Sequence, residues 1–101
     1  MWVIVMETLT PKTIQLIDKY FSVSEQDTVK SLLIEECRDF SERIHFAIIK
    51  LSNGDADTLL QMIHEAKIDY RDVLVWADFA HDVDEHIIWA NTVLHLPNRR
   101  I

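Results

Sequence analysis

The chain has 101 residues, of which 49% are apolar and 27% charged, and its 17 acidic residues outnumber 10 basic ones for a net charge of −7. This size and composition predict one soluble domain, residues 1–101, with a single core, and they exclude a mainly disordered chain. The acidity argues against nucleic-acid binding, which needs a basic surface, and no apolar run approaches the ~20 residues that span a membrane.

The scarcity of turn residues predicts an all-α fold. Gly54 is the only glycine, and Pro11 and Pro97 are the only prolines. Sheets need turn residues at most reversals, whereas helices can begin and end on Ser, Asp and Asn, which are frequent here. We therefore expect a bundle of about five helices. The single cysteine, Cys37, excludes an intrachain disulfide and fits a cytoplasmic location.

Residues 1–9 are expected to form an N-terminal arm. The run from Met1 to Met6 is apolar, but it lacks the basic start and small-residue cleavage site of a secretion signal. Two interpretations stay open: the arm packs on the body or on a second subunit, or translation begins at Met6. At the other end, residues 97–101 are expected to form a short tail.

The first helix is predicted to begin at Thr10-Pro11, where a hydroxyl cap precedes a proline whose missing N–H is not needed. The second is predicted to start after Ser24 and run to about Leu51, which makes it a long spine helix over about residues 25–51. Its apolar residues recur at steps of three and four, as in the seam of a helical bundle; they are Leu33, Cys37, Phe40, Ile44, Ala47 and Leu51.

Three shorter helices are predicted after the spine helix. Asn53-Gly54 should end the spine helix, with the glycine in the left-handed conformation, and Asp55 should cap the third helix. Asp69 should cap the fourth helix and Asp82 the fifth, which Pro97 then stops. Val83 and Ile87 are expected on the buried stripe of this last helix.

Two acidic segments suggest one catalytic alternative. Glu36 and Asp39 belong to a Glu-Glu-x-x-Asp segment of the spine helix, and Asp69 and Asp72 form an Asp-x-x-Asp pair on the fourth helix. This spacing resembles the all-α nucleoside triphosphate pyrophosphohydrolases, although aspartate replaces the usual glutamate at Asp39 and Asp69. The resemblance implies a magnesium site formed by these four acids and hydrolysis of a nucleoside triphosphate. Helix capping explains Asp69 and Asp72 equally well.

An interaction module without catalytic activity is the favoured hypothesis. Phe46 and Ile49 lie opposite the apolar seam of the spine helix, so either the short helices or a second subunit must cover them. With Trp2 in the arm and Trp89 off the main stripe of its helix, they exceed what five helices readily bury. We therefore expect a homodimer or a protein partner, with no cofactor. A third hypothesis, a carrier of a small apolar ligand, depends on Trp76 and Trp89 alone.

Overall fold

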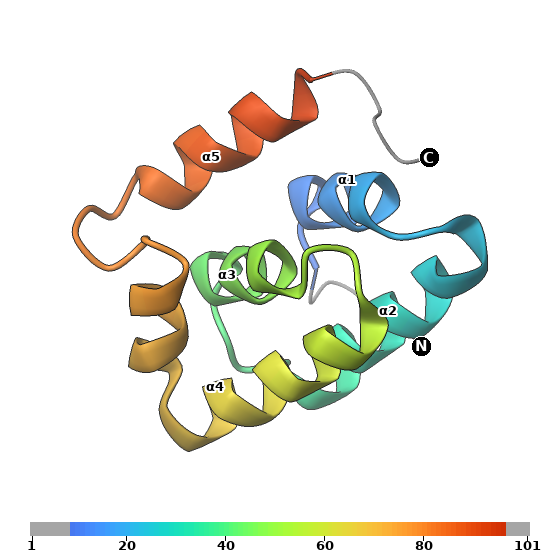
Figure 1. Ribbon diagram of the computed structural model, residues 1–101, viewed down its shortest axis with the longest axis horizontal. Coiled ribbons are helices and arrows are strands. Elements are labelled where there is room, and N and C mark those ends of the chain that lie inside the picture. Colours follow the sequence, from blue (N-terminus) through green and yellow to red (C-terminus); the bar gives the residue numbers. More distant parts are fainter. Residues whose placement is uncertain (1–8, 97–101) are drawn as a thin grey trace, which may run out of the picture.

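The computed structural model describes residues 9–96, and within this range the chain forms five α-helices and no strand (Figure 1). The all-α fold is therefore confirmed. The helices are α1 (Pro11–Tyr20), α2 (Val23–Glu36), α3 (Glu42–Ser52), α4 (Ala56–Trp76) and α5 (Glu85–Leu94). No helix among the described residues is both long enough and apolar enough to cross a membrane. The predicted tail and all of the predicted arm except Leu9 lie outside the described range.

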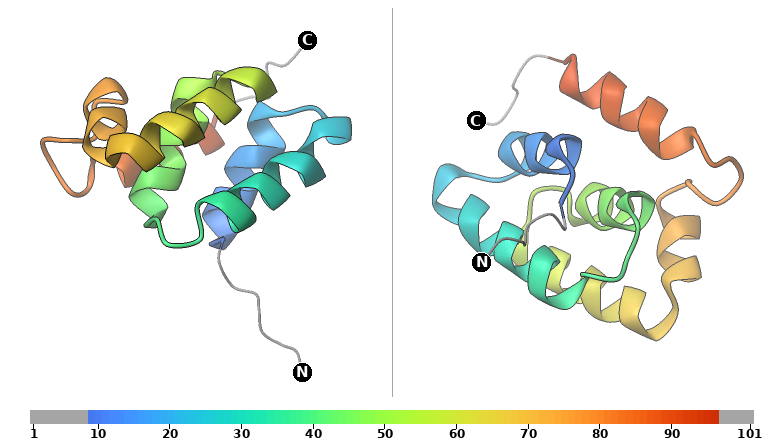
Figure 2. Two further views of the ribbon diagram at one scale, coloured as in Figure 1. Left: turned by 90° about the horizontal axis from the view of Figure 1, so that it is seen from below. Right: turned by 180° about the vertical axis from the view of Figure 1, so that it is seen from behind.

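Helix α3 is the centre of the core. Helices α1, α4 and α5 all pack against it, and α2 packs against α1 and α4 (Figures 1 and 2). The sequence of α3 explains this position, because nearly every residue from Ile44 to Ile49 is apolar and all of them are buried. A helix with apolar side chains on every side must be enclosed on every side. Here the other helices of the same chain enclose it.

The predicted spine helix over residues 25–51 is wrong, because the chain breaks into α2 and α3. Helix α2 ends at Glu36, a turn follows in which the Phe40 amide donates to the Cys37 carbonyl (3.0 Å), and α3 begins after Ser41. Asp39 and Ser41 favour turns and helix starts over helix interiors, which gives a physical reason for the break. Helix α2 also starts earlier than predicted, with Ser22 rather than Ser24 at its N-cap position.

The reversal between α3 and α4 follows the prediction. Asn53 (φ 51°) and Gly54 (φ 82°) both adopt the left-handed conformation, and the Asp55 carboxylate caps α4 by accepting from the Thr58 amide at 2.8 Å. Asp69 also caps the helical segment that follows it, as predicted, but this segment belongs to α4, which is kinked at Asp69. Asp69 has an extended backbone (φ −159°, ψ 101°), and its carboxylate accepts from the Arg71 amide at 3.0 Å. The α4 segment after Asp69 therefore turns away from the first part (Figure 1).

The connection from α4 to α5 is tied to α3 by two cationic side chains. Lys50 donates to the Ala77 carbonyl at 2.7 Å, and Arg43 donates to the Phe79 carbonyl at 3.0 Å through Nε. The Ala77 carbonyl, at the C-terminus of α4, lacks an intrahelical partner and carries partial negative charge, so the Lys50 cation stabilises this end of the helix. The Phe79 ring is buried between His86 and Trp89, which fixes the connection further.

The predicted Asp82 cap of the last helix is wrong. Asp82 instead accepts from the Asp84 amide at 2.9 Å, a local turn that delays the start of α5 to Glu85. Helix α5 buries the side chains of His86 and Ala90, with Trp89, Val93 and Leu94 partly buried.

Candidate functional site

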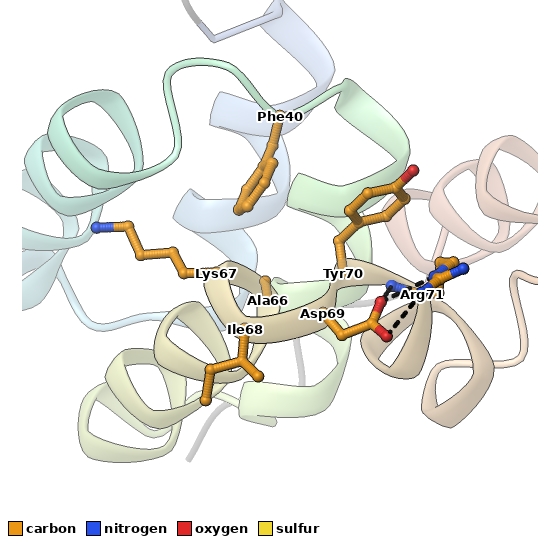
Figure 3. Close-up of a pocket in the computed structure, with 7 residues that line it drawn as sticks. All are labelled: Phe40, Ala66, Lys67, Ile68, Asp69, Tyr70 and Arg71. Atoms are coloured by element: carbon orange, nitrogen blue, oxygen red, sulfur yellow. Dashed lines mark hydrogen bonds and ion pairs between the residues drawn. The ribbon is translucent and has the colours of Figure 1, made fainter.

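Three of the four acids predicted to bind magnesium line two open hollows beside the α4 kink. Phe40 and Lys67 line both hollows; the first, of about 340 Å³, also contains Asp69 and Tyr70, and the second, of about 300 Å³, contains Glu36 and Asp39. Figure 3 shows the first hollow, with the Phe40 and Tyr70 rings near one another and the Lys67 side chain extending away from them. Asp72 is exposed and lines neither hollow.

Two of these four acids already have cationic partners. Lys67 Nζ donates to the Glu36 carboxylate, and Arg71 Nε and Nη2 donate to the two carboxylate oxygens of Asp69 at 3.0 and 3.1 Å (Figure 3). The hydrogen bonds from Arg71 lower the pKa of Asp69, and the hydrogen bond to Glu36 raises the pKa of Lys67. Each pair neutralises a carboxylate that magnesium would need.

The structure does not bring the predicted magnesium ligands together. Between residues 9 and 96 no group of three or more His, Cys, Asp or Glu side chains is placed so that it could hold a metal ion. Helix α2 has ended before Asp39, which removes the helical spacing on which the resemblance depends. The arrangement around the α4 kink is therefore one of local ion pairs and a helix cap.

The predicted interface residues have three different positions. Phe46 and Ile49 are fully buried within the chain, so the helices themselves cover them and no second subunit is needed to do so. Trp89 is partly buried, with its ring centroid 6.0 Å from that of Tyr20 and 5.6 Å from that of Phe79. Trp2 lies outside the described residues. Phe46 and Ile49 are therefore part of the core and do not add to an exposed apolar surface.

A different set of apolar side chains remains exposed, and sequence reasoning missed it. We define the α4–α5 corner as residues 75–88, which cover the end of α4, the connection and the start of α5. It contains five of the large apolar side chains that the structure leaves exposed, with exposed fractions between 38% and 67%. They are Val75, Trp76, Val83, Ile87 and Ile88.

Two sequence signals point to this corner. Trp76 and Val75 are adjacent at a helix end, where a single helical face cannot bury both. Ile87 and Ile88 are adjacent in the same way on α5, and with Trp89 they make three consecutive large apolar residues, more than one buried stripe accommodates. The expected burial of Val83 and Ile87 was wrong: Val83 precedes α5, and Ile87 lies beside the face of α5 that buries His86 and Ala90.

The buried Cys37 thiol and His45 imidazole have structural roles. Burial raises the pKa of the Cys37 thiol to about 11, so the reactive thiolate is scarce at neutral pH. The buried His45 ring lies with Nε2 2.9 Å from the Cys37 carbonyl, which links α3 to the preceding turn. Burial lowers the pKa of His45 and favours the neutral ring that donates this bond. Neither residue has the exposure that a nucleophile or a general base needs.

Comparison of the chain with protein-family models, with curated proteins and with solved structures gives no match.

Proposed function

We propose that the protein is a helical protein-interaction module and that the α4–α5 corner is its contact surface. The single observation that carries this proposal is the concentration of exposed large apolar side chains between Val75 and Ile88. An isolated exposed apolar residue needs no explanation, but a concentration of them is typical of an interaction site. Trp76 adds a large amphipathic ring of the kind that dominates binding energy in protein interfaces.

The corner is also held in place before any partner binds. Lys50 and Arg43 fix the carbonyls of Ala77 and Phe79, and the buried Phe79 ring anchors the middle of the connection to the core. A surface that is already ordered loses less conformational entropy on binding, so its contacts give a more favourable binding free energy. These contacts favour a preformed binding surface on the module.

A display selection tests this function directly. A library of helical peptides is selected for binding to the wild-type protein, and each binder is then measured against Ile88→Asp and against Val23→Asp. Both positions are exposed and apolar, but Val23 is at the start of α2, outside the corner. We expect binders that lose affinity at least about tenfold with Ile88→Asp and keep it with Val23→Asp, because a charge placed in an apolar contact is costly to desolvate. Binders that respond to neither variant would contradict the proposal.

The partner can be a second copy of the chain or a different protein. A homodimer remains a prediction from the sequence, and if it forms we place its interface at the corner, since Phe46 and Ile49 are buried. A cytoplasmic location likewise remains a prediction that depends on the single cysteine.

A further inference from the structure

The formal charges of the α4–α5 corner's own residues are all negative. Lys50 and Arg43 of α3 reach the corner, where they donate to the Ala77 and Phe79 carbonyls and not to the corner carboxylates. Residues 72–98 contain no lysine or arginine, and the corner itself carries four acidic residues. Asp78, Asp82 and Asp84 are exposed, and none of them forms an ion pair within residues 9–96. Elsewhere on the surface, Glu36 and Asp69 have cationic partners, whereas Asp27, Glu35 and Asp57 form no ion pair among the described residues. The corner therefore differs in combining unpaired carboxylates with exposed apolar side chains.

The unpaired carboxylates lie among the exposed apolar side chains. Asp82 and Asp84 flank Val83, and Asp78 follows Trp76 by two residues at the end of α4. A partner that covers the apolar side chains therefore also comes close to these carboxylates. An acidic or neutral partner would desolvate them without providing a counter-charge, which costs free energy, whereas a basic partner would pair with them.

This charge argues against a second copy as the occupant. A twofold dimer through the corner would bring the acidic residues of both copies into one interface, since both subunits contribute the same surface. Like charges at short range repel. The exposed apolar side chains come from the end of α4, the connection and the start of α5, and an amphipathic helix is a common partner of exposed apolar side chains.

From this juxtaposition we infer that the α4–α5 corner binds a basic amphipathic helix of a partner protein. The apolar face of that helix contacts Trp76, Val83 and Ile88, and its lysines or arginines pair with the corner carboxylates. The inference depends on the proposed function and adds the chemistry of the partner to it.

The test uses three amphipathic peptides of about 18 residues, long enough to form a helix, that share one leucine face. Their polar positions are filled with lysine, glutamine or glutamate. Binding of each labelled peptide to the full chain is followed by fluorescence anisotropy. We expect the lysine peptide to bind at least about tenfold more tightly than the glutamine peptide at about 20 mM salt, and the glutamate peptide to bind most weakly. The difference should shrink at about 300 mM salt, because salt screens exposed charges.

Two matched triple variants test whether the preference for the lysine peptide comes from the carboxylates of the α4–α5 corner. Substituting Asp78, Asp82 and Asp84 by asparagine removes the corner charges, and asparagine suits both the left-handed backbone of Asp78 (φ 67°) and the turn that Asp82 caps. The control variant D27N/E35Q/D57N changes the net charge equally at exposed acids outside the corner. We expect the preference for lysine to fall at least about fivefold in the corner variant and to persist in the control.

The outcomes separate the inference from the proposed function. If Ile88→Ser weakens the lysine and glutamine peptides but the two bind equally well to the wild type, the function stands and the inference fails. If both triple variants lose the preference equally, the attraction is a property of net charge and the inference fails. A homodimer that Ile88→Ser dissociates also overturns the inference and leaves the function standing. If no peptide responds to Ile88→Ser or to the second corner variant, Val83→Ser, both proposals fail.

Discussion

The Gly54→Ala substitution gives the sharpest test of the fold, because the structure predicts two separate costs for one added methyl group. Gly54 has φ 82°, and a side chain in the left-handed region costs about 1 kcal/mol. A Cβ at this position would also stand 2.7 Å from the Tyr20 carbonyl oxygen at the end of α1. Ordinary contacts of a Cβ begin at 3.4 Å, so the turn and α1 must separate by about 0.7 Å.

Forcing an extra methyl group into a packed contact typically costs about 1–3 kcal/mol, so we expect Gly54→Ala to lower the free energy of unfolding by about 2–4 kcal/mol in total. Asn53→Ala is the matched control, because Asn53 (φ 51°) has the same left-handed backbone but an exposed side chain. It should cost only about 1 kcal/mol. Urea unfolding followed by circular dichroism measures both variants. Equal losses for the two would refute the close approach of the α3–α4 turn to α1.

Three further predictions concern the core and the corner. Burial lowers the pKa values of His45 and His86, so below about pH 6.5 the unfolded chain binds more protons than the native protein, and the free energy of unfolding should fall as pH drops from about 7 to 5. His45→Gln should flatten this pH dependence in urea titrations, and an unchanged slope would contradict the assignment. Cys37 should react with a thiol reagent at pH 8 at least about a hundredfold more slowly in the native protein than in urea, because its thiol is buried and its pKa is about 11. A native rate close to the rate in urea would show that the core around Cys37 opens to the reagent. Lys50→Met keeps the aliphatic stem but leaves the Ala77 carbonyl without its donor, so it should cost about 1–2 kcal/mol in thermal or urea unfolding, and a neutral result would remove this anchor of the corner.

Three of the five predicted helix caps are confirmed, whereas those at Ser24 and Asp82 are wrong. Thr10, Asp55 and Asp69 each accept a hydrogen bond from a backbone amide two or three residues later, as their positions before apolar runs indicated. Gly54 adopts the left-handed conformation that its position after an apolar run required. Capping depends on a few neighbouring residues, which is why a single sequence contains enough information to predict it.

The direction of the chain between residues 36 and 42 could not be predicted in the same way. Cys37 is buried and Phe40 is packed against the core, as the apolar seam predicted, although both lie in a turn rather than in a helix. Apolar spacing reports which side chains face the core, and two consecutive helices that face one core can preserve that spacing across a turn. Only the weak signals of Asp39 and Ser41 distinguished the two possibilities.

The candidate site was predicted less well than the fold, for a related reason. Phe46 and Ile49 were assigned to a surface because α3 was treated as the outer half of one long helix, whereas the break places α3 at the centre of the core. The magnesium hypothesis required four acids to lie close together. Their spacing along the chain does not determine which of them form ion pairs with Lys67 or Arg71. Exposure at the corner depends on where α5 begins, and helix boundaries are among the least predictable features of a sequence.

The central claim, that the α4–α5 corner is the contact surface, is tested most directly by nuclear magnetic resonance. The uniformly ¹⁵N-labelled chain is titrated with whichever of the three amphipathic peptides binds most tightly. We expect saturable shifts concentrated at the Trp76 indole and at the amides of Val83, Ile87 and Ile88, with little change around Tyr70 in the hollow beside the α4 kink. Shifts concentrated around Tyr70, or the absence of saturable shifts in residues 75–88, would contradict it.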